Sequence, residues 1–303
     1  MNEAMLIRYL RARSAKGAGL VTGIGDDAAV VKGSAGKEWL LKADMIVEGV
    51  HFAHGASERD CGRKAVMCNV SDIAAMGGVP RYALVSAGFP RGFSLARAKK
   101  VSGGVLDALK ECGVLLVGGD TTRSERLILS VAMAGEVERG RAVLRSGARP
   151  GDILFVTGPL GGSLRSGRHL RFRPRLAESR HLVRRYDVHA MLDVSDGLAA
   201  DLGHLARESG VGLRVFEAAV PLHRGVRSVE RAFTDGEDFE LVFAVSPRDA
   251  SRLVCDEAAH KKGFRFHLIG RVVARKKGLK IVAPSGRERS FPPVADHHFG
   301  RRA

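Results

Sequence analysis

The sequence predicts an α/β (α+β) protein built from two domains. Its 303 residues are 45% hydrophobic, which is enough to fill two separate cores. Runs with the composition of strands alternate with helical patterns along most of the chain. Pro150-Gly151 marks a turn, after which the alternation starts again. We therefore predict an N-terminal domain over residues 1–148 and a C-terminal domain over residues 149–303.

The first domain is predicted from six segments. Apolar runs rich in strand-forming residues occupy residues 39–43, 81–89, 114–117 and 127–133. Residues 59–76 and 94–112 instead repeat apolar residues at three- and four-residue spacing, as helices with one buried face do. In the second domain, the same criteria predict strands over residues 152–157 and 241–245 and a helix over residues 197–209.

The net charge of the chain is strongly positive. Lys and Arg number 49 against 33 Asp and Glu, a formal charge of +16, which would permit binding to nucleic acid or to a membrane surface. The basic residues are dispersed, and they are not interleaved with aromatic residues. The N-terminus lacks a signal pattern, and no apolar run approaches the length of a membrane span. We therefore expect a cytoplasmic protein without a nucleic-acid or membrane partner.

Five short acidic motifs stand out against this basic background, and each is predicted to lie where an apolar run breaks into a turn. Aspartate beside glycine can hold hard divalent cations through oxygen while backbone N–H groups remain available to phosphate. Any one such motif is also typical of an ordinary turn or helix N-cap. Together they indicate Mg²⁺ and a polyphosphate; they occupy residues 25–27, 42–44, 69–72, 118–122 and 193–197.

The order and flanks of these motifs resemble one enzyme family. The segment from Gly62 to Pro80, followed by Gly-Gly-Asp-Thr-Thr at 118–122 and Asp-Val-Ser-Asp-Gly at 193–197, is similar to thiamine-monophosphate kinases. That family belongs to the superfamily of ATP-using enzymes that includes aminoimidazole ribonucleotide synthetase. The resemblance extends from Gly23 to about Phe299. It implies an aminoimidazole ribonucleotide synthetase-like fold, with a dimer-forming sheet in the N-terminal α/β domain, a C-terminal α/β domain, and a homodimer.

The resemblance also implies which residues bind metal and nucleotide. The chain has no Walker A loop, so the phosphates would be held by glycine-rich backbone, by Mg²⁺ and by an Arg that can contact two oxygens at once. Asp27, which follows Asp26, is a weaker candidate for a metal ligand, because an aspartate at this position can simply cap the turn. The implied metal ligands are Asp26, Asp44, Asp72, Asp120, Asp193 and Asp196, and the implied ATP-binding residues are Gly119, Asp120, Thr121, Arg145 and Ser195.

For the substrate, the resemblance implies His51, Glu237 and Asp238. A carboxylate at this place suits a cationic thiazolium or an aminopyrimidine donor. Outside such a motif, a lone His is usually structural, and an acidic turn usually starts a helix.

Two departures from the family pattern concern the metals and the substrate. Lys42-Ala43 stands where the family usually has two hydroxyl residues, so either one metal is lost or Lys42 points elsewhere. Near the C-terminus, residues 294–299 lack the aromatic residue that the family tends to place before Asp-His-Phe. The number of Mg²⁺ ions and the substrate affinity are therefore open.

The expected function is that of a kinase that moves the γ-phosphoryl group of ATP directly onto thiamine monophosphate, giving thiamine diphosphate. The acceptor is already anionic, so no general base is assigned, and positioning with charge neutralisation by Mg²⁺ would carry the reaction. Another ATP-dependent enzyme of the superfamily, of the purine-synthesis or selenophosphate type, is an alternative. A non-catalytic nucleotide- or nucleic-acid-binding protein is a third, favoured only by the charge of +16.

Overall fold

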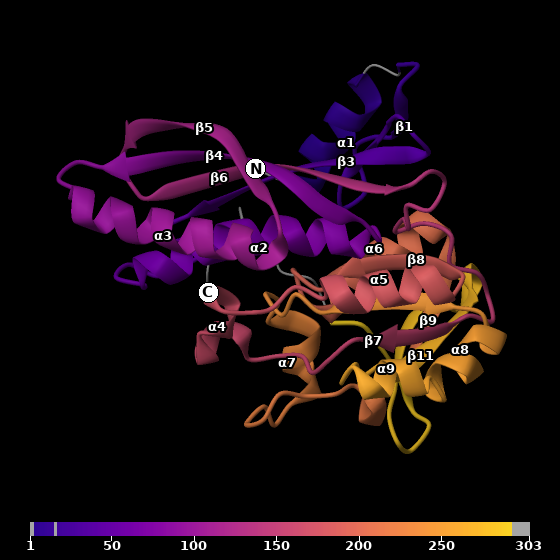
Figure 1. The fold of residues 1–303 in the computed structure, drawn as a ribbon. Helices are drawn as coiled ribbons and strands as arrows, with labels where there is room; N and C mark the ends of the chain where they lie inside the picture. Colours follow the sequence, from indigo (N-terminus) through magenta and orange to yellow (C-terminus); the bar gives the residue numbers. More distant parts are fainter. Residues whose placement is uncertain (1–2, 15–16, 293–303) are drawn as a thin grey trace.

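The structure is a computed structural model that describes residues 3–14 and 17–292. Within them the chain forms two sheets, each with its own helices (Figure 1). The six-stranded first sheet has the order β1-β2-β3-β6-β4-β5, and the seven-stranded second sheet has the order β13-β12-β9-β11-β7-β10-β8. The strands of the first sheet are β1 (Leu20–Thr22), β2 (Ala29–Lys32), β3 (Lys37–Val47), β4 (Val79–Pro90), β5 (Leu115–Ser124) and β6 (Ile128–Glu138). Those of the second are β7 (Ile153–Val156), β8 (Val188–Asp193), β9 (Val211–Phe216), β10 (Leu241–Val245), β11 (His267–Ala274), β12 (Leu279–Val282) and β13 (Glu288–Ser290).

The helices divide between the two sheets. In the first half of the chain they are α1 (Glu3–Arg13), α2 (Glu58–Ala75) and α3 (Leu95–Cys112). In the second half they are α4 (Ser163–Ser166), α5 (Leu176–Arg185), α6 (Leu198–Ser209), α7 (Val229–Thr234), α8 (Pro247–Val254) and α9 (Glu257–Lys261), with short 3₁₀ turns over 168–170, 217–219 and 275–277. Among the described residues, no helix has the length and apolar character needed to cross a membrane.

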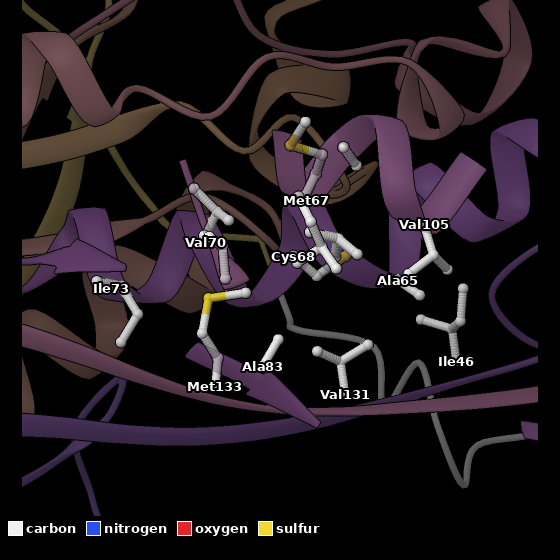
Figure 2. Close-up of a cluster of buried hydrophobic side chains, with 14 of the residues drawn as sticks. Ile46, Ala65, Met67, Cys68, Val70, Ile73, Ala83, Val105, Val131 and Met133 are labelled. Carbon is white, nitrogen blue, oxygen red and sulfur yellow. The ribbon is translucent and has the colours of Figure 1, made fainter. Parts of the chain in front are cut away.

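The core of the first half lies between α2 and the sheet. Side chains alternate between buried and accessible along β6, as the period of two in a strand requires, so only one face of the strand enters the core. Figure 2 shows Val131 and Met133 on this face, packed against Val70 and Ile73 of α2. Helix α2 thus covers one face of the sheet, and α3 packs against α2.

Helix α2 is buried almost all round, because it is enclosed on two sides. It contacts β3, β6 and α3 in its own half, and also α5 and β8 of the second half. Four polar side chains of α2 are consequently buried: Lys64, Asn69, Ser71 and Asp72. A helix in this position brings polar groups to the boundary between the two sheets, where each needs a partner.

Close contact between α2 and α3 depends on glycine. A side chain on Gly104 of α3 would overlap the backbone carbonyl of Arg59 on α2, and one on Gly62 of α2 would overlap the carbonyl of Val101. Neither carbonyl belongs to a flexible group that could move aside. The two helices would have to separate to accommodate a methyl group at either position.

We expect Gly104→Ala to lower the free energy of unfolding by about 1–3 kcal/mol, since the added carbon forces the helices apart. The neighbouring Gly103→Ala is the matched control. There the new carbon meets only the end of the Arg59 side chain, at 3.2 Å, and the better helix propensity of Ala should stabilise the protein by up to about 1 kcal/mol. Chemical denaturation of both variants would test this, and equal effects would contradict the account.

The second sheet is covered on both faces. Along β10, Val242 and Ala244 face the core that contains α6, whereas Leu241, Phe243 and Val245 face the core that contains α5 and α8. A strand covered on both sides is apolar throughout, which explains the continuous apolar run at 241–245 in the sequence.

The expectation that every acidic motif lies at a turn is wrong for three of the five. Residues 42–44 lie inside β3, residues 69–72 inside α2, and residues 118–122 inside β5. At Gly119 the chain continues as a strand because the residue has no side chain: a Cβ there would overlap the backbone carbonyl of Val85 on β4. The glycines at 118–119 therefore permit close strand pairing here rather than a turn.

Candidate functional site

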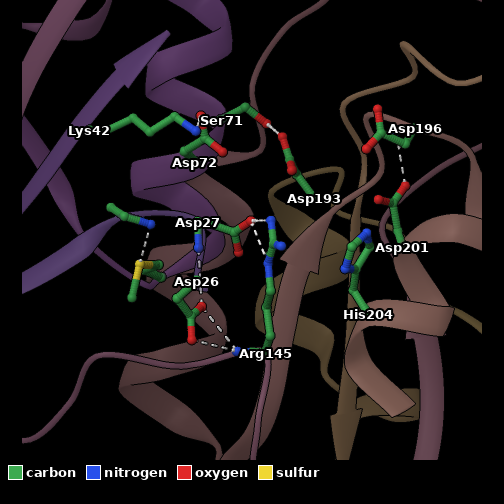
Figure 3. A network of polar contacts seen from close by, with 12 residues as sticks. Asp26, Asp27, Lys42, Ser71, Asp72, Arg145, Asp193, Asp196, Asp201 and His204 are labelled. Carbon is green, nitrogen blue, oxygen red and sulfur yellow. Dashed lines mark hydrogen bonds and ion pairs between the residues drawn. The ribbon is translucent and has the colours of Figure 1, made fainter. Parts of the chain in front are cut away.

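Three carboxylates from distant parts of the sequence meet between the two halves of the chain. One oxygen each of Asp27, Asp72 and Asp193 lies within 4.8 Å of the others, and all three residues are buried. Asp27 precedes β2, Asp72 lies in the last turn of α2, and Asp193 ends β8 (Figure 3). Such a group of like charges is unfavourable without a cation, and carboxylate oxygens are the ligands that Mg²⁺ prefers.

Asp27 has one satisfied and one unsatisfied oxygen. Its Oδ1 accepts hydrogen bonds from Nε of Arg145, at 3.1 Å, and from Nη2 of the same guanidinium. Its Oδ2 is buried and has no hydrogen-bond partner among the described residues. Leaving a charged oxygen in this state costs free energy, so the atom fits a ligand position for a cation.

The surroundings of the other two carboxylates also disfavour their charged forms. Burial, together with the charge of Asp27, raises the pKa of Asp193 to about 7, although the hydroxyl of Ser71 donates to its Oδ2 at 2.5 Å. Burial raises the pKa of Asp72 well above its ordinary value, despite the opposing effect of Lys42. A divalent cation bound here would favour the charged forms of both carboxylates and so oppose these shifts.

The other metal ligands expected in these motifs have different contacts. The carboxylate of Asp26 accepts the backbone N–H of Arg145, at 3.1 and 3.3 Å from its two oxygens, and that of Asp27 at 3.2 Å. Burial, and then Asp27, raise the pKa of Asp26 to about 6. The backbone N–H of Asp196 donates to Asp201, another buried carboxylate. Of the adjacent pair, the structure thus brings Asp27 into the group of three, and Asp26 is outside it.

The expected nucleotide residues on β5 are separated from this group. Gly119, Asp120 and Thr121 are all exposed on the outermost strand of the first sheet. Gly119 pairs with Val85 of β4, and three strand spacings, roughly 14 Å along the sheet, separate it from Asp44 on β3. Within one chain, Asp120 and Asp44 are therefore too far apart to bind the same ion.

Lys42 points into the acidic group. Its Nζ lies 3.1 Å from Oδ1 of Asp44 and 3.1 Å from Oδ2 of Asp72. Burial acts to lower the pKa of Lys42, but Asp72 and Asp44 outweigh it and hold the pKa above its ordinary value. Of the two possibilities left open by the sequence, the structure excludes the one in which Lys42 points elsewhere.

The expected substrate residues His51 and Glu237 both contact a third residue, Lys64. This lysine is completely buried in α2; its Nζ donates to the backbone carbonyl of His51 at 2.8 Å and forms an ion pair with the carboxylate of Glu237. The imidazole Nδ1 of His51 accepts the backbone N–H of Val47 at 3.1 Å, so the neutral ring carries its proton on Nε2. Lys64 thus links the loop after β3 to the loop before β10.

The loop that carries Glu237 is hydrogen-bonded to the acidic motif at 193–197, which contains the expected ATP-binding residue Ser195. The N–H of Glu237 donates to the carbonyl of Ser195 at 2.7 Å, and Glu237 itself has a φ of 59°. Asp238, by contrast, accepts the N–H of Gly161 at 2.7 Å and a hydrogen bond from Arg168 at 3.2 Å. Burial raises the pKa of Asp238 to about 6. With its side chain inaccessible to solvent, Asp238 secures the loop while Glu237 remains partly accessible.

Comparison with known proteins places the chain in a family. Models of the N-terminal and C-terminal domains of AIR synthase related proteins match residues 25–137 and 149–282. The thiamine-monophosphate kinase of Rhodopirellula baltica is 38% identical over 96% of this chain and 95% of its own. The Bacillus subtilis enzyme of the same name is 36% identical over 81% of this chain and 84% of its own. A solved structure described as AaThiL complexed with AMPPCP and TMP is 30% identical, with a TM-score of 0.78, and the match covers 94% of this chain and 93% of that one.

The chain belongs to the thiamine-monophosphate kinase family. This confirms the fold class and the kinase function expected from the motifs, and it does not favour the purine-synthesis, selenophosphate or nucleic-acid alternatives. The predicted lack of an aromatic residue over 294–299 lies outside the described residues.

For this kinase, sequence reasoning missed Lys64 and gave too little weight to Asp27. The available signal for Lys64 is that four apolar residues, 65–68, follow it within the helix, because a lysine buried among apolar residues must find a partner. For Asp27, the sequence gives no signal that separates it from Asp26.

Proposed function

We propose that this kinase transfers the γ-phosphoryl group of ATP directly to the phosphate of thiamine monophosphate, with Mg²⁺ held by Asp27, Asp72 and Asp193. When bound, Mg²⁺ would neutralise the charge that develops on the transferred group. The observation that supports this most strongly is the buried Oδ2 of Asp27, which lacks a partner among the described residues and belongs to the group of three carboxylates. Asp196 and Ser195 lie in the same motif as Asp193 and are proposed as further contacts to the metal or to ATP.

The residues of the chain would then act by positioning and by charge. Arg145, which is partly accessible and fixed by Asp27, can present a guanidinium edge to the nucleotide phosphates. His51 and Glu237, held through Lys64, would contact the thiamine part of the acceptor. The acceptor phosphate is already ionised, so no side chain has to remove a proton from it.

The proposal is tested by the metal dependence of product formation. With ATP and thiamine monophosphate, removal of divalent ions by EDTA should abolish formation of thiamine diphosphate, and excess Mg²⁺ should restore it. Ca²⁺ binds oxygen ligands at longer distances and with looser geometry, so it should restore binding of the nucleotide better than turnover. Undiminished turnover in EDTA would contradict the role of the three carboxylates.

We also propose that two copies of the chain associate through the first sheet, and that the kinase is cytoplasmic. The sheet face opposite α2 exposes large apolar side chains, and Leu41, Tyr82, Leu84 and Val117 line one hollow on it. β5 also leaves an edge on which Leu115 is 63% exposed. An exposed apolar sheet face with an open edge is typical of an association surface. Joining two copies here would also bring Asp120 of one chain toward the other.

Lys64→Met should raise the KM for thiamine monophosphate by about tenfold or more, with a much smaller change in the KM for ATP. The methionine keeps the size of the side chain, but Glu237 and the carbonyl of His51 both lose the ammonium that holds them. Lys64→Arg keeps the charge and should recover part of the affinity, whereas a purely structural role would give parallel losses for both substrates. Steady-state kinetics with each substrate varied in turn would distinguish the two results.

A further inference from the structure

The ammonium group of Lys42 occupies the space between two carboxylates in the manner of a bound cation. It lies 3.1 Å from an oxygen of Asp44 and 3.1 Å from an oxygen of Asp72, and those residues come from β3 and α2. Lys42 and Asp44 are two positions apart on one strand, so their side chains leave the same face of the sheet. Figure 3 shows the Lys42 side chain reaching to Asp72 at the border of the acidic group.

The charges joined by these contacts can be counted directly. Four carboxylates take part: Asp27, Asp44, Asp72 and Asp193. Two cationic side chains oppose them, Lys42 on Asp44 and Asp72, and Arg145 on Asp27. With these six side chains ionised, two negative charges remain uncompensated among them, so the group can accept a further cation.

Asp72 takes part both in the contact with the ammonium of Lys42 and in the group of three carboxylates. Its Oδ2 is already 3.1 Å from the ammonium, and the residue also belongs to the group with Asp27 and Asp193. A cation between Asp44 and Asp72 would have to displace Lys42 and would meet its positive charge at close range. A cation among Asp27, Asp72 and Asp193 would not have to displace the ammonium, and it would satisfy the Oδ2 of Asp27, which has no hydrogen-bond partner among the described residues.

We propose that Lys42 is a built-in substitute for one divalent cation, so that this chain binds one metal ion fewer than the same site would with a hydroxyl residue at position 42. The inference rests on the proposed metal site and adds to it the number of ions and the place where none binds. Asp44 is then neutralised by Lys42 and is not a ligand of the resident ion.

The test counts Mn²⁺, used in place of Mg²⁺, bound to the purified protein without nucleotide. Free Mn²⁺ is measured by electron paramagnetic resonance during a titration. The wild-type chain should bind about one ion tightly, whereas Lys42→Thr, which removes the ammonium and supplies a hydroxyl, should bind about two. Lys37→Thr is the matched control on the same strand: Lys37 lies near Glu136 and Glu138, outside the acidic group, so its replacement should leave the count unchanged.

Two further variants, Asp44→Asn and Asp193→Asn, test the inference if Lys42→Thr does not fold. Asp44→Asn should keep the wild-type count, because its charge is already balanced by Lys42, whereas Asp193→Asn should lose the ion. The same count in Lys42→Thr as in the wild type, or loss of the ion in Asp44→Asn, would overturn the inference alone. A wild-type chain that binds no Mn²⁺ would overturn both this inference and the proposed metal site.

Discussion

Asp27→Asn should lower kcat for thiamine monophosphate phosphorylation by about 10³-fold or more, equivalent to about 4 kcal/mol of transition-state stabilisation. The substitution keeps the shape of the side chain but removes the charge of an oxygen that is buried and has no hydrogen-bond partner in the described part of the chain. Charge at this place matters most when negative charge is redistributed during transfer. Initial rates of thiamine diphosphate formation at saturating ATP and Mg²⁺ would measure the loss.

The adjacent Asp26→Asn is the sharpest control for this experiment. Asp26 accepts the backbone N–H groups of Arg145 and Asp27, and the amide oxygen of Asn can still accept them. We expect a loss of no more than about tenfold. Asp107→Asn, an exposed site on α3, controls for the substitution itself. Equal losses in the Asp26 and Asp27 variants, or a larger loss for Asp26, would contradict the assignment of Asp27 as the ligand.

Asp120→Asn should reduce activity to below about 1% of wild type, yet a mixed dimer should recover it. Asp120 lies on the outer strand, roughly 14 Å along the sheet from the position of Asp44, so we expect it to serve the site of the second chain. In a heterodimer of one Asp120→Asn chain and one Asp27→Asn chain, one of the two sites then has both aspartates. That heterodimer should show about half of the wild-type activity.

The heterodimer can be isolated by placing a different affinity tag on each chain and purifying over both. Each homodimeric variant, prepared in the same way, gives the background. If Asp120 acts within its own chain, both sites of the heterodimer are defective and no activity returns. A preparation that is monomeric by analytical ultracentrifugation, yet fully active, would contradict the proposed association as well.

Much of this fold was predictable from the sequence, because the signals were local. The run at 241–245 is a strand covered on both faces, and the spacing over 59–76 matches α2 to within a residue. The acidic motif at 118–122 lies in a strand and not in the expected turn, for a reason that is not local. Gly119 is required by the carbonyl of Val85, a residue of the neighbouring strand, and no pattern within the motif reports that contact.

The residue types of the site could be predicted from the sequence, but which side chains contact one another could not. The short acidic motifs indicate a cation, and the structure brings together one aspartate from each of three of them, those at 25–27, 69–72 and 193–197. Which member of the pair at 26–27 faces the others depends on the exact path of the loop, and both residues look alike in sequence. Lys64 and Glu237 are 173 positions apart, so their ion pair arises only when the second half of the chain packs on α2.

The most direct test of the account is the fate of the γ-phosphoryl group. Purified protein, incubated with γ-³²P-labelled ATP, Mg²⁺ and either thiamine monophosphate or thiamine, would be followed by chromatography of the thiamine compounds. We expect labelled thiamine diphosphate from thiamine monophosphate, with ADP formed in equal amount. Thiamine offers only a neutral hydroxyl, so we expect no labelled product from it at a comparable rate. Release of ADP without labelled thiamine diphosphate, or faster labelling of thiamine, would contradict this expectation.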